Sequence, residues 1–224
     1  ELCGLSQIAC LPGYEEATEE TVYAVLQEAA KFSSDVLATL NKVGDVQGSH
    51  LIGAAVVVPD GFAEAYQMFV DNGWSALGKN ADLGGQGLPS LVDTAVTEMW
   101  NSANMSFSLL PMLNAGAVEA IQVHASEWIK STFLPKIVAG TWAATMNLTE
   151  AHAGSDLAAI RTRAVPDGEF FRIIGQKIFV TWGDHELTEN IIHLVLARLQ
   201  DAPNGSNGVS LFLVPKFLVD RNGN

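Results

Sequence analysis

The sequence is poor in cysteine, in basic residues and in long apolar runs. Among its 224 residues are 2 cysteines and 12 lysines and arginines, against 25 aspartates and glutamates, which gives a formal net charge of −13. Non-specific binding to a nucleic-acid backbone requires the opposite sign of charge. No apolar run approaches the ~18 residues of a membrane-spanning helix. A secretory signal would show a basic segment followed by an apolar segment, and this pattern is not present. We therefore expect neither a nucleic-acid partner nor a membrane span.

The scarcity of cysteine also limits the kinds of site that the chain can hold. Cys3 and Cys10 are too few for a disulfide framework, so we expect free thiols, with one short-loop disulfide as the alternative. The five histidines show no spacing typical of zinc ligands, and there is no Cys-x-x-Cys pair. We expect no metal site, and a location in the bacterial cytoplasm or an organelle matrix.

Composition and charge patterning divide the chain into two parts. Apolar residues make up 48% and charged residues 17%, which excludes a disordered chain. Residues 1–140 hold 16 acidic and 5 basic residues, whereas residues 141–224 hold 9 and 7. Because the hydrophobic period changes at the same place, we predict two domains, 1–140 and 141–224.

The first part shows helical periodicity. Thr18 is suited to cap a helix from Glu19 to about Leu40, and Asp60 one that stops before Gly73. Further helices are expected from Pro89 to about Ala103, over Ala115–His124, and over Glu127–Leu134, where Pro135 should end the helix. Five helices with short links predict an all-α bundle.

The second part favours strands. Short runs rich in β-branched and aromatic residues predict strands over Ala143–Leu148, Phe170–Ile174, Lys177–Thr181, Ile192–Arg198 and Val209–Pro215. No helical segment separates them, so an antiparallel sheet is favoured over βαβ units. Five strands are few for a closed sheet. The predicted fold is α+β and multidomain: an N-terminal helical bundle followed by a truncated antiparallel β domain.

Residues 147–156 form the first segment whose residue types could bind a ligand. The run Asn147-Leu148-Thr149-Glu150-Ala151-His152-Ala153-Gly154-Ser155-Asp156 follows an apolar strand. Gly154 and Ser155 would let backbone and hydroxyl donors approach a phosphate, and Thr149 offers a donor to a planar heteroaromatic edge. The alternative is a plain turn with local side-chain hydrogen bonds from Thr149, Ser155 and Asp156.

A second segment follows at Gly175-Gln176-Lys177-Ile178-Phe179-Val180-Thr181-Trp182-Gly183. On a strand, Phe179 and Thr181 would share one face and offer an aromatic wall and a hydroxyl. An ordinary amphipathic strand is the alternative. A third glycine-rich run, Gly84–Gly87, lacks the preceding strand of a dinucleotide-binding loop and is better explained as the entry to the helix at Pro89.

Together these segments resemble the acyl-CoA dehydrogenase family. They match its Thr-Glu-Pro-x-x-Gly-Ser-Asp loop and its Gly-x-Lys-x-aromatic-(Ile/Val)-Thr-x-Gly segment, although Ala151 replaces the proline and Phe179 stands where many relatives have tryptophan. The resemblance covers nearly the whole chain. The segments 11–16, 146–150 and 189–198 are similar to the branch of the family that includes 3-methylmercaptopropionyl-CoA dehydrogenase.

The resemblance implies FAD-dependent oxidation of an acyl-CoA thioester to trans-2-enoyl-CoA. It places the glutamate base in a C-terminal helical domain that we expect this chain to lack, so no catalytic residue is assigned. The isolated fragment is expected to be inactive and to bind FAD weakly or not at all. The implied flavin contacts are Met146, Leu148, Thr149, Gly154, Ser155, Phe179, Val180 and Thr181, with Ser155 also a candidate for binding the substrate.

Partners follow from the same resemblance. It implies an acyl-CoA substrate, an electron-transfer flavoprotein as electron acceptor, and a homo-oligomer, either dimer or tetramer. Two alternatives stay open: a catalytically silent relative used for binding or assembly, and an acyl-CoA oxidase, in which oxygen takes the electrons.

Overall fold

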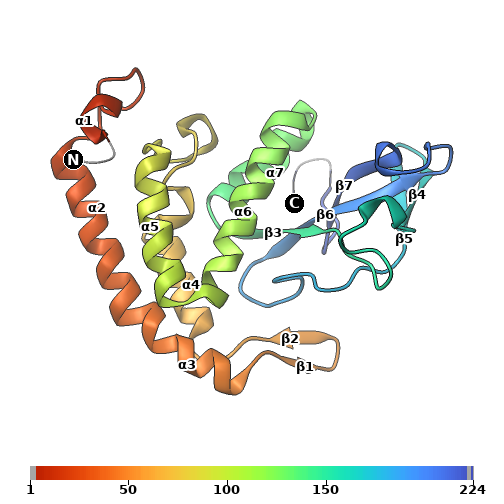
Figure 1. The fold of residues 1–224 in the computed structure, drawn as a ribbon, viewed down its shortest axis with the longest axis horizontal. Helices are drawn as coiled ribbons and strands as arrows, with labels where there is room; N and C mark the ends of the chain where they lie inside the picture. Colours follow the sequence, from red (N-terminus) through yellow and green to blue (C-terminus); the bar gives the residue numbers. More distant parts are fainter. Residues whose placement is uncertain (1–3, 221–222, 224) are drawn as a thin grey trace.

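The computed structural model describes residues 4–220 and residue 223. A helical part leads into a β-sheet, and α6 and α7 lie between the remaining helices and the sheet (Figure 1). Cys3 lies outside the described residues, whereas Cys10 is a free and exposed thiol, as expected. Within the described part of the chain, no helix is long and apolar enough to cross a membrane.

The helical part is built largely as the periodicity predicts. Helix α2 and α3 are joined by a π-helical turn over Phe32–Leu37, so that the helix is continuous from Glu19 to Gln47. A small hairpin, β1 and β2, follows it. The bounds are α1 Leu5–Ile8, α2 Glu19–Lys31, α3 Ala38–Gln47, β1 His50–Ile52, β2 Ala55–Val57, α4 Phe62–Asp71, α5 Ser90–Ala103, α6 Met105–His124 and α7 Glu127–Val138.

The helix ends show which caps local sequence signals predicted correctly. The hydroxyl of Thr18 accepts a hydrogen bond from the Thr21 N–H at 3.2 Å, which confirms the predicted cap of α2. Asp60 does not cap α4; Gly61 occupies that position in a left-handed conformation, and Asp60 instead pairs with the amide of Gln47. Three helices also extend beyond their expected bounds: the first runs to Gln47, α6 begins at Met105, and α7 ends at Val138.

Pro135 does not end α7, contrary to the prediction. The helix continues to Val138, although a proline inside a helix removes one hydrogen bond. Ile137 and Val138 are each only 1% exposed. Burial of these two side chains offsets the cost of the interior proline.

The sheet is mixed, and this corrects the antiparallel prediction. Strand β6 (Asn190–Leu199) pairs in parallel with β3 (Trp142–Asn147) and briefly with β4 (Arg163–Asp167). The β4–β5 (Phe170–Ile174) and β6–β7 (Val209–Pro215) pairs are antiparallel. The connection from β3 to β6 contains loops and the β4–β5 hairpin instead of a helix. The absence of a helical pattern between the strands therefore did not exclude parallel pairing.

Two further corrections concern individual strands. Strand β4 was not predicted, because proline and charge interrupt its apolar pattern. Residues 177–181, predicted as a strand, form an irregular segment without ladder partners. Positive φ angles of 56° at Phe179 and 52° at Trp182 are incompatible with extended pairing.

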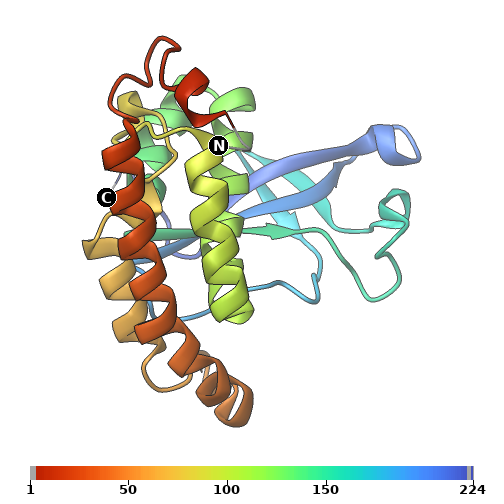
Figure 2. The same cartoon turned by 60° about the vertical axis from the view of Figure 1, so that its left-hand side comes forward.

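Two buried clusters hold the parts together. The first gathers aromatic side chains of α4, α5 and α6, including Phe69, whose ring lies 5.0 Å from that of Trp100. The second joins α6 and α7 to β3 and β6. The Asn114 amide oxygen accepts from the Ala144 N–H at 2.7 Å, which ties α6 to β3. The sheet therefore packs directly on the helices (Figure 2).

Candidate functional site

The first segment leaves the sheet at the end of β3. Met146 lies on the strand, and Leu148 and Thr149 follow it half-buried. A tight turn comes next, in which Glu150 and Ala153 exchange main-chain hydrogen bonds of 2.9 and 3.0 Å. Beyond this turn Gly154 and Ser155 are exposed. The segment thus passes from a buried strand to a surface with free backbone.

The second segment is an exposed loop. The Phe179 side chain is 88% exposed, and Val180 accepts a turn hydrogen bond from the Gly183 N–H at 3.1 Å. Because no strand forms, the expectation that Phe179 and Thr181 share a strand face is wrong. A bulky residue with positive φ is strained by about 1–3 kcal/mol, and such strain clusters at functional sites.

The fold brings the two segments together. The Ile178 N–H donates to the Thr149 carbonyl at 2.9 Å, and the Lys177 ammonium donates to the Leu148 carbonyl at 2.9 Å. Leu148 and Thr149 therefore lie beside the residues that precede Phe179, Val180 and Thr181. Gly154 is close to Thr149, since a Cβ there would lie 3.5 Å from the Thr149 methyl group.

Glu150 is the buried centre of this arrangement. Its side chain is 4% exposed and accepts from the Arg161 N–H at 2.7 Å, the Thr162 N–H at 3.0 Å and the Thr162 hydroxyl at 2.6 Å. It also pairs with Lys177 at 2.9 Å. Burial alone would raise the pKa of Glu150, but the hydrogen bonds from Thr162, Arg161 and Lys177 outweigh it and lower the pKa to about 2.

Hydroxyl groups around this centre are available to a ligand. Within residues 4–220, the side-chain hydroxyls of Thr149, Ser155 and Thr181 make no hydrogen bond, whereas Asp156 accepts from the Ala158 N–H at 3.0 Å. The plain-turn alternative thus holds for Asp156 and not for Thr149 or Ser155. The three hydroxyls and the exposed ring of Phe179 are thus groups with which a planar, polar ligand can interact.

Trp182 fixes the far end of the second segment to the helices. Its indole N–H donates to the Ser106 carbonyl at 2.9 Å, and its ring lies 6.4 Å from that of Phe62. A cavity of about 410 Å³ opens here, between the β1–β2 hairpin, the start of α6 and the loop. Val180 and Thr181 line it. Two predicted site residues therefore face a cavity shared by both parts of the chain.

Two histidines lie beside this loop, the buried His185 and the half-buried His193. His185 is 3% exposed and accepts from the Leu187 N–H through Nδ1 at 3.2 Å, which leaves its Nε2 buried without a partner among the described residues. Burial and the positive charge of Lys216 lower the pKa of His185 to about 4, against an opposing effect of Asp184. Burial also lowers the pKa of His193. Both imidazoles are neutral near pH 7.

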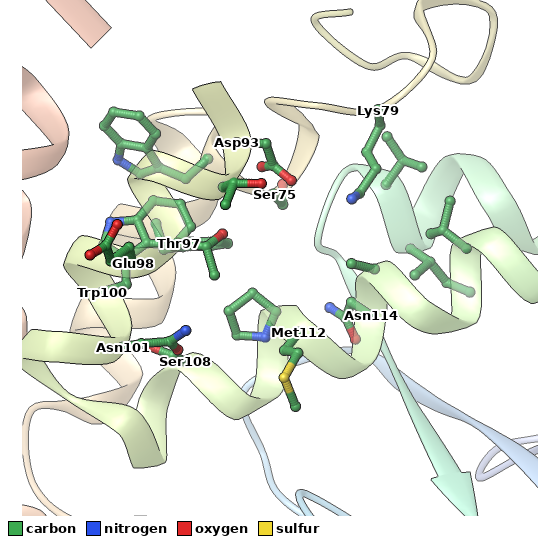
Figure 3. A pocket seen from close by; sticks show the side chains of 18 residues that line it. Ser75, Lys79, Asp93, Thr97, Glu98, Trp100, Asn101, Ser108, Met112 and Asn114 are labelled. Carbon is green, nitrogen blue, oxygen red and sulfur yellow. The ribbon is translucent and has the colours of Figure 1, made fainter. Parts of the chain in front are cut away.

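A second cavity lies apart from the predicted site. It has a volume of about 570 Å³ and is lined by α5, α6, α7 and the turn that contains Lys79. Figure 3 shows the Lys79 ammonium facing this space from one side and Asp93 and Thr97 from another. None of the eight predicted site residues lines it. The motif residues and the larger cavity thus indicate two different candidate ligand sites, and the free hydroxyls favour the site at the motif residues.

The sequence did not single out Glu150, Lys177 or Trp182. All three stand inside the quoted segments, but nothing in their spacing shows which charged side chain is buried or which indole finds a carbonyl. Glu150 follows Thr149 and Lys177 follows Gln176, so no run of neighbouring apolar residues indicates that either charge is buried.

Family models match most of the chain. Residues 20–141 match the model described as acyl-CoA dehydrogenase, N-terminal domain. Residues 145–222 match acyl-CoA dehydrogenase, middle domain.

Individual relatives agree with this. The chain is 46% identical over 218 residues to a 3-methylmercaptopropionyl-CoA dehydrogenase of Ruegeria pomeroyi, covering 97% of this chain and 37% of that protein. It is 38% identical over 209 residues to a butyryl-CoA dehydrogenase of Syntrophomonas wolfei, covering 91% and 34%. The chain thus spans about a third of the length of these curated relatives.

Solved structures share the fold. An acyl-CoA dehydrogenase from Geobacillus kaustophilus superposes with a TM-score of 0.72 at 23% identity, and covers 89% of this chain and 49% of its own. Butyryl-CoA dehydrogenase from Megasphaera elsdenii gives a TM-score of 0.71 at 20% identity, with the same coverage of both chains.

Proposed function

Since this chain belongs to the acyl-CoA dehydrogenase family, we propose that it supplies flavin contacts to an enzyme that oxidises an acyl-CoA thioester to trans-2-enoyl-CoA. The observation that carries the proposal is the meeting of the two segments, which places Thr149 beside Ile178, while the hydroxyls of Thr149, Ser155 and Thr181 have no partners among the described residues. The domain division at residues 140 and 141 belongs to the same proposal, and the end of α7 at Val138 and the start of β3 at Trp142 support it.

The chain's residues fit FAD in their chemistry. Met146 and Leu148 offer apolar contact to the isoalloxazine edge, Phe179 an aromatic surface, and Thr149 and Thr181 hydroxyl donors, while Val180 lines the adjoining cavity. Gly154 has an ordinary φ, and a Cβ there would make an ordinary van der Waals contact with the Thr149 methyl group at 3.5 Å, so folding alone does not require glycine there. Close approach of a pyrophosphate to Gly154 and Ser155 does favour it. Ser155 also stands as a candidate contact of the CoA moiety.

FAD, when bound, would supply the hydride acceptor for the β-hydrogen of the acyl chain. The protein's own contribution is to orient the ligand, to donate hydrogen bonds from Thr149 and Thr181, and to exclude water with Phe179 and Val180. We assign no catalytic base among the described residues.

The wider setting is part of the proposal. Within it the substrate is an acyl-CoA, the electron acceptor is an electron-transfer flavoprotein, and the active form is a dimer or tetramer. A bacterial cytoplasm or an organelle matrix is the proposed location.

The test is chemical-shift mapping of the chain with FAD, which detects even millimolar binding. The expected result is that perturbations gather at residues 148–149, 154–155 and 179–181. AMP is the matched control, because it lacks the isoalloxazine ring and should leave residues 179–181 unchanged. Perturbations confined to the cavity beside Lys79 would contradict the proposal.

A further inference from the structure

Lys177 makes two buried contacts with the first segment. Its ammonium donates to the Leu148 carbonyl and to Glu150 Oε1, both at 2.9 Å. The Lys177 side chain is 8% exposed and that of Glu150 is 4% exposed. Exposed ion pairs contribute little to the stability of a fold, but loss of one partner of a buried pair leaves an uncompensated charge in the interior. The geometry of this pair is therefore strongly enforced.

Glu150 cannot move to follow Lys177. The N–H groups of Arg161 and Thr162 and the Thr162 hydroxyl hold its carboxylate at the entry to β4. The second segment also passes close to this point, since a Cβ on Gly175 would lie 2.3 Å from the Thr162 hydroxyl oxygen. Glu150 is thus a fixed reference to which Lys177 is attached.

No strand ladder sets the register between the two segments. Residues 176–180 lie outside any strand, and the Ile178 N–H donates to the Thr149 carbonyl as the main-chain bond between them. A single main-chain bond allows slippage, and a shift by one residue would move Phe179 and Thr181 relative to Leu148 and Thr149. Two contacts at Lys177, next to Ile178 in the chain, prevent this.

We propose that Glu150 and Lys177 form a positioning pair, which fixes residues 178–181 in register on residues 148–149. The pair touches no ligand; it determines where Phe179, Val180 and Thr181 stand relative to Leu148 and Thr149. Its consequence for flavin binding rests on the proposed function, whereas its effect on the register does not.

Hydrogen exchange of the Ile178 amide in the 224-residue chain tests the pair. In Lys177→Met this amide should exchange at least about tenfold faster than in the wild type, while that of Ile192 in β6 keeps its rate. Because Lys177→Met leaves the Glu150 charge uncompensated, the neutral double variant Glu150→Gln/Lys177→Met serves where the single one fails to fold. It should show the same local release.

Ile137→Val is the matched control, because it removes a buried methyl group in α7 and lowers stability without touching either segment. An unchanged Ile178 rate in the lysine variants would overturn the proposal. So would an increase shared by Ile192 and matched by the control, since that would report only global stability.

A parallel titration with FAD separates the two proposals. Local release of Ile178 in a chain whose FAD-induced shifts gather beside Lys79, and not at residues 179–181, would support the positioning pair and contradict the flavin site. FAD-induced shifts at residues 179–181 that are the same in wild type and in the double variant would overturn the positioning pair.

Discussion

The indole N–H of Trp182 donates to the main-chain carbonyl of Ser106, 76 positions earlier in the chain, at 2.9 Å. Ser106 lies in the first turn of α6, and Trp182 directly follows the irregular residues 177–181, which include Phe179 and Thr181. The ring of Trp182 also lies 5.6 Å from that of His185. One side chain therefore ties the candidate site to the helices.

Replacing Trp182 by phenylalanine should destabilise the chain by about 1 kcal/mol. The variant keeps an aromatic ring against Phe62 but removes the donor to Ser106, and one hydrogen bond contributes about that amount. Urea denaturation measures the change. Trp128→Phe, at a ring that is 42% exposed, is the control, and an equal loss in both variants would show that the Ser106 contact contributes nothing.

Replacing Phe179 by glycine should stabilise the fold, by up to about 1 kcal/mol. Glycine relieves the strain of the positive φ, which exceeds its entropic cost, and an 88% exposed ring loses little burial. The same variant should weaken the FAD-induced shifts, because the aromatic surface is gone. Phe170→Gly, at another exposed phenylalanine but within β5, should destabilise instead. Thermal denaturation of both variants decides the matter.

Acidification should destabilise the chain through His185. The folded-state pKa is about 4 against an ordinary 6.5, so between these values the unfolded chain binds a proton that the folded chain excludes. Stability is therefore full above pH 6.5 and falls as the pH drops towards 4, by on the order of 3 kcal/mol. In His185→Gln this slope should flatten. An NMR titration that places the His185 midpoint near 6.5 would contradict the prediction.

Thr181→Val should slow flavin reduction by about tenfold or more in the FAD-loaded, full-length enzyme. Valine keeps the shape and removes a hydroxyl that has no partner among the described residues, and one hydrogen bond to a charged acceptor contributes ~1.5–3 kcal/mol. Stopped-flow absorbance measures the rate. Thr181→Ser retains the hydroxyl and should react nearly as the wild type does, so an equal effect of both changes would argue against a donor role.

The sequence by itself determined the elements whose signals are local. The hydroxyl of Thr18 caps α2 because the N–H that it accepts from is three residues away. The apolar spacing from Phe62 to Phe69 places one face of α4 in the core. Strands β5 and β7 have the predicted bounds, because turn residues flank each apolar run. The two motif segments were likewise identified from residue types alone.

Only the tertiary structure decided which strands and side chains meet. The parallel pairing of β6 with β3 depends on the path of the chain across the intervening residues 148–189, which no local period encodes. Residues 177–181 form no strand despite their β propensity, because their positions are set by long-range hydrogen bonds from Lys177 to the Leu148 carbonyl and from Trp182 to the Ser106 carbonyl. Glu150 finds Thr162 and Lys177 for the same reason: a buried charge takes the partners that the fold brings within reach, and sequence separation does not reveal them.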